Sequence, residues 1–198
     1  MDSALAYNMN CLMEGSVMSQ TRPSSDPVEI DASDPLRLHD VDHVRFYCGN
    51  AKQAAYFYAW NFGFQVEQYR DLTTGSRDTA SYLLRQGNIR LILETGLTAD
   101  HEAAQEVATY GDGVKDVSLT VNDAEAAYEQ AIRNGAESGY EPIEETDEHG
   151  TVVRAAIRSY GRVLHTFVSR KGDYGLNTVR AGGRFGPGWE KVSHFPLN

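Results

Sequence analysis

The sequence has 198 residues, 41% of them hydrophobic and 23% charged, which is typical of a soluble globular protein with one sizeable domain or two small ones. Its formal net charge of -10 would repel a polyanion, so we expect no nucleic-acid partner. No apolar run approaches the roughly 18 residues of a membrane-spanning helix, and the two cysteines cannot form a disulfide framework, so we expect a cytoplasmic protein with no membrane partner.

The N-terminal 37 residues differ in composition from the rest of the chain. Residues 19–34 are rich in Ser, Asp and Pro, and such a segment buries little apolar surface. The segment also lacks the basic start and continuous apolar core of a signal peptide. We therefore predict that residues 1–37 form a disordered extension, and we assign no function to it.

Regular apolar periodicity begins near residue 38. Residues 41–48 alternate in polarity, with Val44 and Phe46 on one face and His43 and Arg45 on the other. Such alternation predicts a strand with one face buried and the other polar.

A helix and three more strands complete this first unit. Asn50 is a predicted N-cap, the residues at 51–62 have helical spacing of apolar side chains, and Gly63 ends the helix. Three strand-like runs follow, separated by glycine turns: 64–70, 79–85 and 89–95. The predicted order of elements is β-α-β-β-β.

The same order then recurs. After a short predicted helix at 100–109 and a turn at 111–113, residues 114–121 alternate as a second strand, and Asp123 caps a predicted helix over 124–133. Three strand-like runs complete this unit: 140–146, 151–159 and 162–169.

The two units align without a gap through the first strand and the helix. His43 aligns with Asp116 and Asn50 with Asp123, so the offset is constant. Both predicted caps and both apolar faces match, which indicates an internal duplication. The two modules span about 40–98 and 113–171.

Several short stretches carry a resemblance to a known family. In chain order they are residues 48–55, 75–82, 111–116, 149–153 and 165–168. Together they resemble the N-terminal half of the 4-hydroxyphenylpyruvate dioxygenases, and the hydroxymandelate synthases are the nearest relatives with the same architecture. The resemblance covers residues 38–171, about two thirds of the chain.

The resemblance implies an α+β fold of the vicinal oxygen chelate type, also found in glyoxalase and bleomycin-resistance proteins. In this fold, two paired β-α-β-β-β modules face one another around a cavity and the helices pack outside. Residues 38–172 would form this domain, and residues 173–198 a linker-like tail. Polar strand positions would face the cavity: His43, Arg45, Tyr47, Asp116, Ser118 and Thr120.

The resemblance also implies an activity. The family enzymes are Fe(II)-dependent and convert 4-hydroxyphenylpyruvate and O2 to homogentisate and CO2 in tyrosine catabolism. Two His and one Glu hold the iron in the C-terminal half, and this sequence does not contain that half. We therefore expect the N-terminal domain of such an enzyme, with no catalytic or metal-binding residue, unknown substrate-binding residues and homo-oligomeric assembly. The aromatic 2-oxo acid, O2 and Fe(II) would bind to the complete enzyme.

Three residues occupy the positions in this half that are equivalent to the iron ligands. They are His43, Asp116 and Thr166, and because Thr is a poor neutral ligand we interpret the set as vestigial. We expect His43 and Asp116 to hydrogen-bond one another or buried water. A rearranged metal set would use His43 and Asp116 with either Glu94 or His165.

Three alternative interpretations remain open. The chain could be a fragment of a hydroxymandelate synthase, because the residues that decide the product lie in the other half. It could be a stand-alone, non-catalytic protein that binds a small aromatic acid. It could also keep a divergent metal site with glyoxalase-like or dioxygenase-like activity. The dioxygenase interpretation predicts an exposed apolar patch where the catalytic half docks.

The remaining features have simpler interpretations. Residues 185–189 resemble the family's segment between the two halves, with Gly186 in place of Leu. Cys48 lies on the apolar face of a strand and is predicted to be a small core residue. The acidic run at 141–148 is predicted to be a solvated sheet edge. The other histidines are predicted to lie on the solvated surface: His39, His101, His149 and His194.

Overall fold

The structure, a computed structural model, describes residues 36–193. The predicted extension at 1–37 therefore lies almost entirely outside the described residues, as does His194. Within residues 36–193, no helix has the length and apolar character needed to cross a bilayer.

The elements follow the duplicated order that the sequence predicts. The first module consists of β1 (Leu38–Tyr47), α1 (Ala51–Phe62), β2 (Gln65–Arg70), a short 3-10 turn (Leu72–Thr74), β3 (Thr79–Gln86) and β4 (Ile89–Gly96). The second consists of β5 (Gly113–Val121), α3 (Ala124–Arg133), β6 (Ser138–Asp147), β7 (Gly150–Arg158) and β8 (Leu164–Gly172), and α2 (Glu102–Tyr110) joins the modules. The tail contains α4 (Leu176–Arg180) and β9 (Glu190–Lys191). Both long helices begin and end where predicted.

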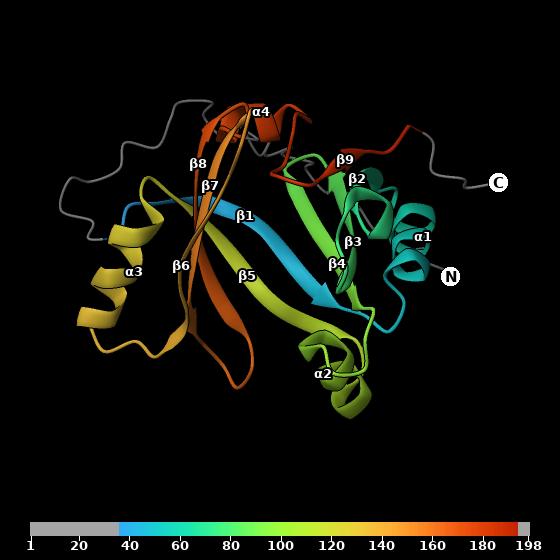
Figure 1. The fold of residues 1–198 in the computed structure, drawn as a ribbon, viewed down its shortest axis with the longest axis horizontal. Coiled ribbons are helices and arrows are strands. Elements are labelled where there is room, and N and C mark those ends of the chain that lie inside the picture. The colour runs from blue at the N-terminus through green and yellow to red at the C-terminus, as the bar shows by residue number, and fades with distance from the viewer. Residues whose placement is uncertain (1–35, 194–198) are drawn as a thin grey trace, which may run out of the picture.

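All strands belong to one sheet with the order β6-β7-β8-β5-β1-β4-β3-β2-β9. β1 and β5 pair antiparallel at its centre, while β4 is parallel to β1 and β8 is parallel to β5. Each module therefore contributes four strands in the same relative order. The two halves curve toward each other, and α1 and α3 lie on the outside (Figure 1). This arrangement confirms the predicted fold of two paired modules.

The curvature brings the two sides of the sheet together. Arg70 at the end of β2 and Glu145 on β6 belong to different modules, and six strands separate β2 from β6 in the sheet order. Nevertheless, Arg70 Nη1 lies 3.7 Å from Glu145 Oε1. The sheet therefore encloses a cleft on its concave face.

Each module has its own apolar core between the sheet and its outer helix. Cys48 is buried in the first core with Ala51, Ala55 and Leu93, which confirms its predicted role. The first core comprises Cys48, Ala51, Ala55, Phe64, Leu84, Leu91 and Leu93, and the second comprises Val121, Ala124, Ala127, Ala131 and Phe167. Small alanines on the inner helix faces let both helices pack closely on the strands.

Equivalent caps start the two outer helices. The Asn50 side chain accepts a hydrogen bond from the Gln53 backbone N–H, and the Asp123 side chain accepts from Glu125 and Ala126. Each cap satisfies backbone donors that the first helical turn leaves free.

We predict that Asn50→Ala and Asp123→Ala each lower the free energy of unfolding by about 1 kcal/mol, because each removes these acceptors. Urea denaturation followed by circular dichroism measures the change. Lys52→Ala, at an exposed position of α1, is the control and should change stability by less than about 0.5 kcal/mol. Cap variants as stable as the parent chain would contradict the role of the caps.

The tail packs against both modules. Tyr174 is buried against Val152 and Val168 of the second module. A separate buried cluster joins the tail to the first module, and it comprises Leu83, Ile92, Val179, Phe185 and Trp189. β9 also pairs antiparallel with β2. Residues 174–191 therefore cover one end of the cleft.

The acidic run predicted to form a solvated edge lies on and just beyond β6, an outermost strand of the sheet. All of residues 141–148 are exposed except Glu145, which is half-buried. The prediction is confirmed, and exposed carboxylates on an edge strand discourage pairing with another chain.

Candidate functional site

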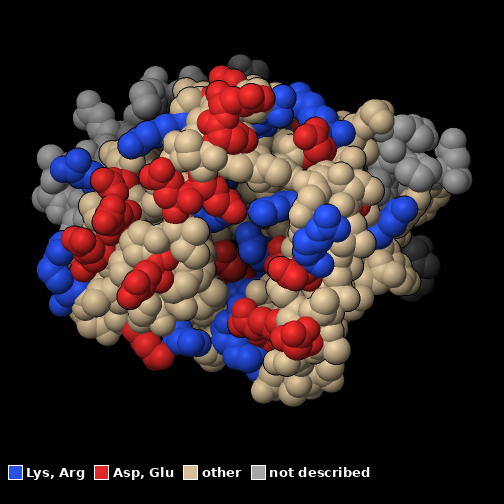
Figure 2. All heavy atoms as spheres, in the orientation of Figure 1, with Lys and Arg blue, Asp and Glu red and all other residues tan. Residues whose placement is uncertain are grey.

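The concave face of β1 and β5 carries the polar positions that the sequence places in the cavity. Phe46 packs toward α1 in the first core, so the alternating residues His43 and Arg45 face the cleft. Ser118 is the register partner of His43 on β5, and Asp116 is the partner of Arg45. Figure 2 shows basic and acidic side chains in the recess between the two halves.

An irregularity in β1 adds a residue that simple alternation places on the other face. The β1–β5 register shifts between Val41 and His43, and both Asp42 and His43 are buried on the cleft side. A β-bulge allows two consecutive side chains to point the same way. The sequence analysis missed Asp42, and its position directly before His43 was the only available signal.

A chain of buried hydrogen bonds joins the two modules. His43 Nδ1 lies 2.7 Å from Asp42 Oδ1, and His43 Nε2 lies 3.1 Å from Ser118 Oγ. Ser118 Oγ donates to Asp116 Oδ2 at 2.7 Å, and the Thr166 backbone N–H donates to Asp116 Oδ1 at 3.1 Å. His43 and Asp116 are therefore connected through Ser118 and not by a direct hydrogen bond, which was one of the two arrangements that we expected.

Asp42 also forms a buried ion pair across the cleft. Arg170 on β8 donates from Nη2 to Asp42 Oδ1 at 2.9 Å and from Nε to Asp42 Oδ2 at 3.0 Å. Burial by itself would raise the pKa of Asp42, but Arg170 and the hydrogen bond with His43 hold that pKa well below its ordinary value. Burial lowers the pKa of His43, against the opposing effect of Asp42. Asp42 is therefore ionised at neutral pH.

The ligand-equivalent residues do not form a site that fits an iron ion. Both ring nitrogens of His43 and both carboxylate oxygens of Asp116 already have hydrogen-bond partners. Thr166 Oγ1 lies 3.0 Å from the Tyr140 hydroxyl. A metal ion would have to replace these contacts with a ligand set in which a Thr hydroxyl takes the place of a carboxylate.

The rearranged set does not converge either. Glu94 Oε2 accepts a hydrogen bond from Ser81 Oγ at 2.9 Å and lies 3.7 Å from Arg45 Nη1. His165 Nδ1 lies 3.3 Å from the Val117 carbonyl oxygen. Between residues 36 and 193, no group of three or more His, Cys, Asp or Glu side chains is placed to hold a metal ion.

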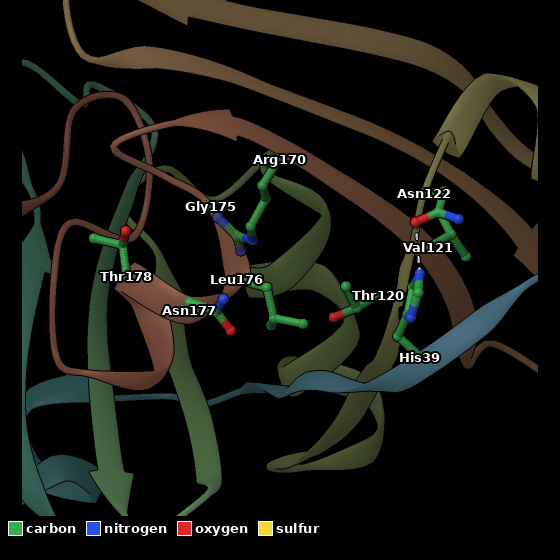
Figure 3. A pocket seen from close by; sticks show the side chains of 9 residues that line it. All are labelled: His39, Thr120, Val121, Asn122, Arg170, Gly175, Leu176, Asn177 and Thr178. Atoms are coloured by element: carbon green, nitrogen blue, oxygen red, sulfur yellow. Dashed lines mark hydrogen bonds between the residues drawn. The ribbon is translucent and has the colours of Figure 1, made fainter. Parts of the chain in front are cut away.

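The other histidines have local roles. His39 is exposed, as predicted, and its Nε2 lies 2.7 Å from Asn122 Oδ1 in a pocket between α4 and the ends of β1 and β5 (Figure 3). His101 is half-buried, and its ring accepts a hydrogen bond from the Ala103 backbone N–H at the start of α2. His149 is also half-buried, 3.5 Å from Asp173 Oδ2. The prediction of solvated surface residues was thus too simple for His101 and His149.

Comparison with known proteins identifies the family. A family model described as hydroxyphenylpyruvate dioxygenase, HPPD, N-terminal, matches residues 33–178, which is more than half of the chain. The chain belongs to the 4-hydroxyphenylpyruvate dioxygenase family. The 4-hydroxyphenylpyruvate dioxygenase of Tetrahymena thermophila is 42% identical over 138 residues, which cover 67% of this chain and 34% of that protein. The enzyme of Dictyostelium discoideum is 41% identical over 164 residues, which cover 81% of this chain and 42% of that protein.

This chain therefore spans less than half the length of these family members.

Solved structures confirm the vicinal oxygen chelate fold. A mutant 4-hydroxymandelate synthase from Streptomyces coelicolor matches with a TM-score of 0.61 at 23% identity, over 75% of this chain and 44% of that chain. Methylmalonyl-CoA epimerase from Mycobacterium tuberculosis matches with a TM-score of 0.55 at 18% identity, over 70% of this chain and 91% of that chain.

Proposed function

We propose that this chain is the N-terminal, non-catalytic domain of a 4-hydroxyphenylpyruvate dioxygenase. The complete enzyme would convert 4-hydroxyphenylpyruvate and O2 to homogentisate and CO2, using Fe(II) held by the part of the family protein that this chain does not match. We place this enzyme in the cytoplasm as a homo-oligomer. The match of residues 33–178 to the family's N-terminal model carries the proposal.

The hydrogen bonds in the cleft support a structural role for this domain. The family resemblance implies that His43 and Asp116 are equivalent in position to iron ligands, but in this chain they belong to a buried hydrogen-bond network that links the two modules. Such a network stabilises the fold, because breaking it leaves buried donors and acceptors unsatisfied. The domain would therefore stabilise the enzyme and contribute none of its iron ligands.

An exposed aromatic surface on α1 supports docking of further protein. Phe57, Trp60 and Phe62 are 54%, 73% and 54% exposed, and the rings of Phe57 and Phe62 lie 5.8 Å apart. Clustered exposed aromatic side chains are costly in water and often mark a contact with another protein surface. The catalytic part of the enzyme, or a second subunit, would cover this surface.

Activity assays test the proposal. The purified chain, supplied with Fe(II), ascorbate and 4-hydroxyphenylpyruvate, should form neither homogentisate nor hydroxymandelate and should consume no O2. A chimera in which this chain replaces the matching N-terminal part of the Dictyostelium discoideum enzyme should form homogentisate, with the unmodified enzyme as the control. Homogentisate formed by the chain alone, or a folded chimera without turnover, would contradict the proposal.

A further inference from the structure

The outer face of α1 differs from the outer face of its counterpart α3. The exposed residues of α3 are Glu125, Ala126, Glu129 and Arg133, whereas those of α1 are Lys52, Gln53, Phe57, Trp60, Asn61 and Phe62. The offset that aligns His43 with Asp116 also aligns Trp60 with Arg133. Both helices lie on the outside of the sheet (Figure 1). Since α3 has the charged composition of a solvated helix face, the aromatic face of α1 is composed for contact with another surface.

A groove opens beside this face of α1. The residues that line it include Gln53, Ala54 and Phe57 of α1 and Phe46 of β1, and its volume is about 450 Å³. Pockets of this size accommodate whole small molecules, so an indole ring can enter. The groove and the Trp60 side chain, which is 73% exposed, belong to the same helix. α1 therefore carries both an exposed ring and a recess that can receive one.

The residues of α1 on this side are arranged symmetrically about Phe57. When a second copy packs its α1 antiparallel on this one, with the two-fold axis at Phe57, residues at equal distances before and after Phe57 face each other. Trp60 then faces Ala54 of the second copy at the groove. Gln53 faces Asn61, so that two side-chain amides can exchange hydrogen bonds. A contact between two identical faces needs such self-complementarity, because every residue must suit its partner in both directions.

The charges of α1 also suit a second copy. Lys52 is its single charged residue, and the two Lys52 side chains would lie at opposite ends of an antiparallel contact. The chain has a net charge of -10, so two copies that met through their acidic faces would repel each other. α1 contains no Asp or Glu with which a basic partner could pair. The partner surface that fits is uncharged and aromatic, and the α1 face of another copy is such a surface.

We propose that this face of α1 binds the same face of a second copy of the chain, with the Trp60 indole of each copy in the groove of the other. The proposal rests on the homo-oligomeric assembly proposed for the enzyme and deepens it by naming the interface. Assembly is measured by mass and the dioxygenase function by turnover, so either can fail without the other.

Burial of Trp60 supplies most of the binding energy of this contact. A tryptophan that fills a pocket at the centre of an interface is often the residue whose loss weakens binding most. The rings of Phe57 and Phe62, 5.8 Å apart, add apolar area beside it. α1 has 12 residues and is about 18 Å long, so the contact is small. We therefore expect a dimer that dissociates on dilution.

Sedimentation equilibrium of the full chain over a range of concentrations measures the assembly. We expect a species with twice the mass of one chain at high concentration and the single chain after dilution. Acrylamide quenching of tryptophan fluorescence then identifies the residue that becomes buried. Trp60 is exposed in the single chain, whereas Trp189 is only 6% exposed, so quenching should fall as the dimer forms.

Substitutions on the two outer helices locate the interface. Trp60→Arg, which introduces the residue found at the aligned position of α3, should weaken dimerisation at least about tenfold, because the ring that fills the groove is lost. Ala126→Arg is the matched control, since it adds the same charge to the exposed face of α3 and should leave dimerisation unchanged. If Trp60→Arg does not fold, Phe57→Glu takes its place and sets two carboxylates against each other at the axis.

A double variant tests the antiparallel register. Gln53→Glu with Asn61→Lys places opposite charges face to face across the contact, twice in each dimer. Dimerisation should be at least about threefold tighter than with either single change. Both changes also suit the helix, with a carboxylate near its start and an ammonium near its end.

Four results would overturn the proposal. The first is a chain that sediments with the mass of one copy at every concentration. The second is a Trp60→Arg dimer as tight as the parent dimer. The third is a double variant that binds no more tightly than the single changes. The fourth is a Trp60→Arg chimera with the Dictyostelium discoideum catalytic part that keeps its assembly and loses its turnover, which would assign the surface to that part.

Discussion

Phe185→Ala will lower the free energy of unfolding by about 3–5 kcal/mol, the usual cost of truncating a buried aromatic side chain. The ring is 1% exposed and contacts His43, Trp189 and the Arg170 guanidinium. Its removal leaves a cavity and takes the ring from a buried cation. Urea denaturation monitored by circular dichroism measures the loss.

The matched control is Tyr160→Ala, because Tyr160 is also aromatic but is 84% exposed. That variant should change stability by less than about 0.5 kcal/mol. If the two variants were equally stable, Phe185 would make no net contribution to the fold, and the tail would be a linker with no structural role.

Asp42→Asn will have an effect of similar size. The substitution keeps the shape of the side chain but removes the charge that neutralises Arg170, and both residues are buried. Breaking a buried ion pair by removing one partner costs about 3–5 kcal/mol, because the other charge stays buried without compensation. Denaturation with urea at neutral pH measures the effect.

Asp40→Asn provides the comparison for this prediction. Asp40 also pairs with an arginine, Arg180, but both side chains are more than one third exposed. Solvent screens such a pair, so the substitution should cost no more than about 1 kcal/mol. The double variant Asp42→Asn with Arg170→Met should recover part of the lost stability, since it removes the uncompensated charge. A double variant less stable than Asp42→Asn would contradict this account of the ion pair.

Local patterns were sufficient for the elements of the fold. Asn50 caps the start of α1 and Gly63 ends it, and the structure places the helix at Ala51–Phe62 as predicted. Caps, left-handed glycines and alternating strand faces act over a few residues, so they can be read along the chain. The repeat of the same signals around Asp123 predicted the duplication, and the sheet order confirms it.

The candidate site was predictable only in part. His43 and Asp116 were placed in the cavity correctly, but their link through Ser118 depends on the register of β1 with β5. Asp42 was missed because a bulge reverses the side on which it lies. Arg170 was missed because its partner Asp42 lies 128 residues earlier in the chain.

The sequence alone thus determined the strands, the helices, the duplication and the family, because each depends on local spacing or on motifs. The tertiary structure decided how the Gly-rich tail is used. Its composition resembles a linker, but Phe185 and Trp189 are buried against the first module, since Leu83 and Ile92 form an apolar surface there that side chains distant in sequence cover. The tertiary structure likewise brought two arginines to Asp42: Arg170 pairs with its carboxylate and Arg90 donates to its backbone carbonyl oxygen, an arrangement that long-range packing creates and local sequence does not encode.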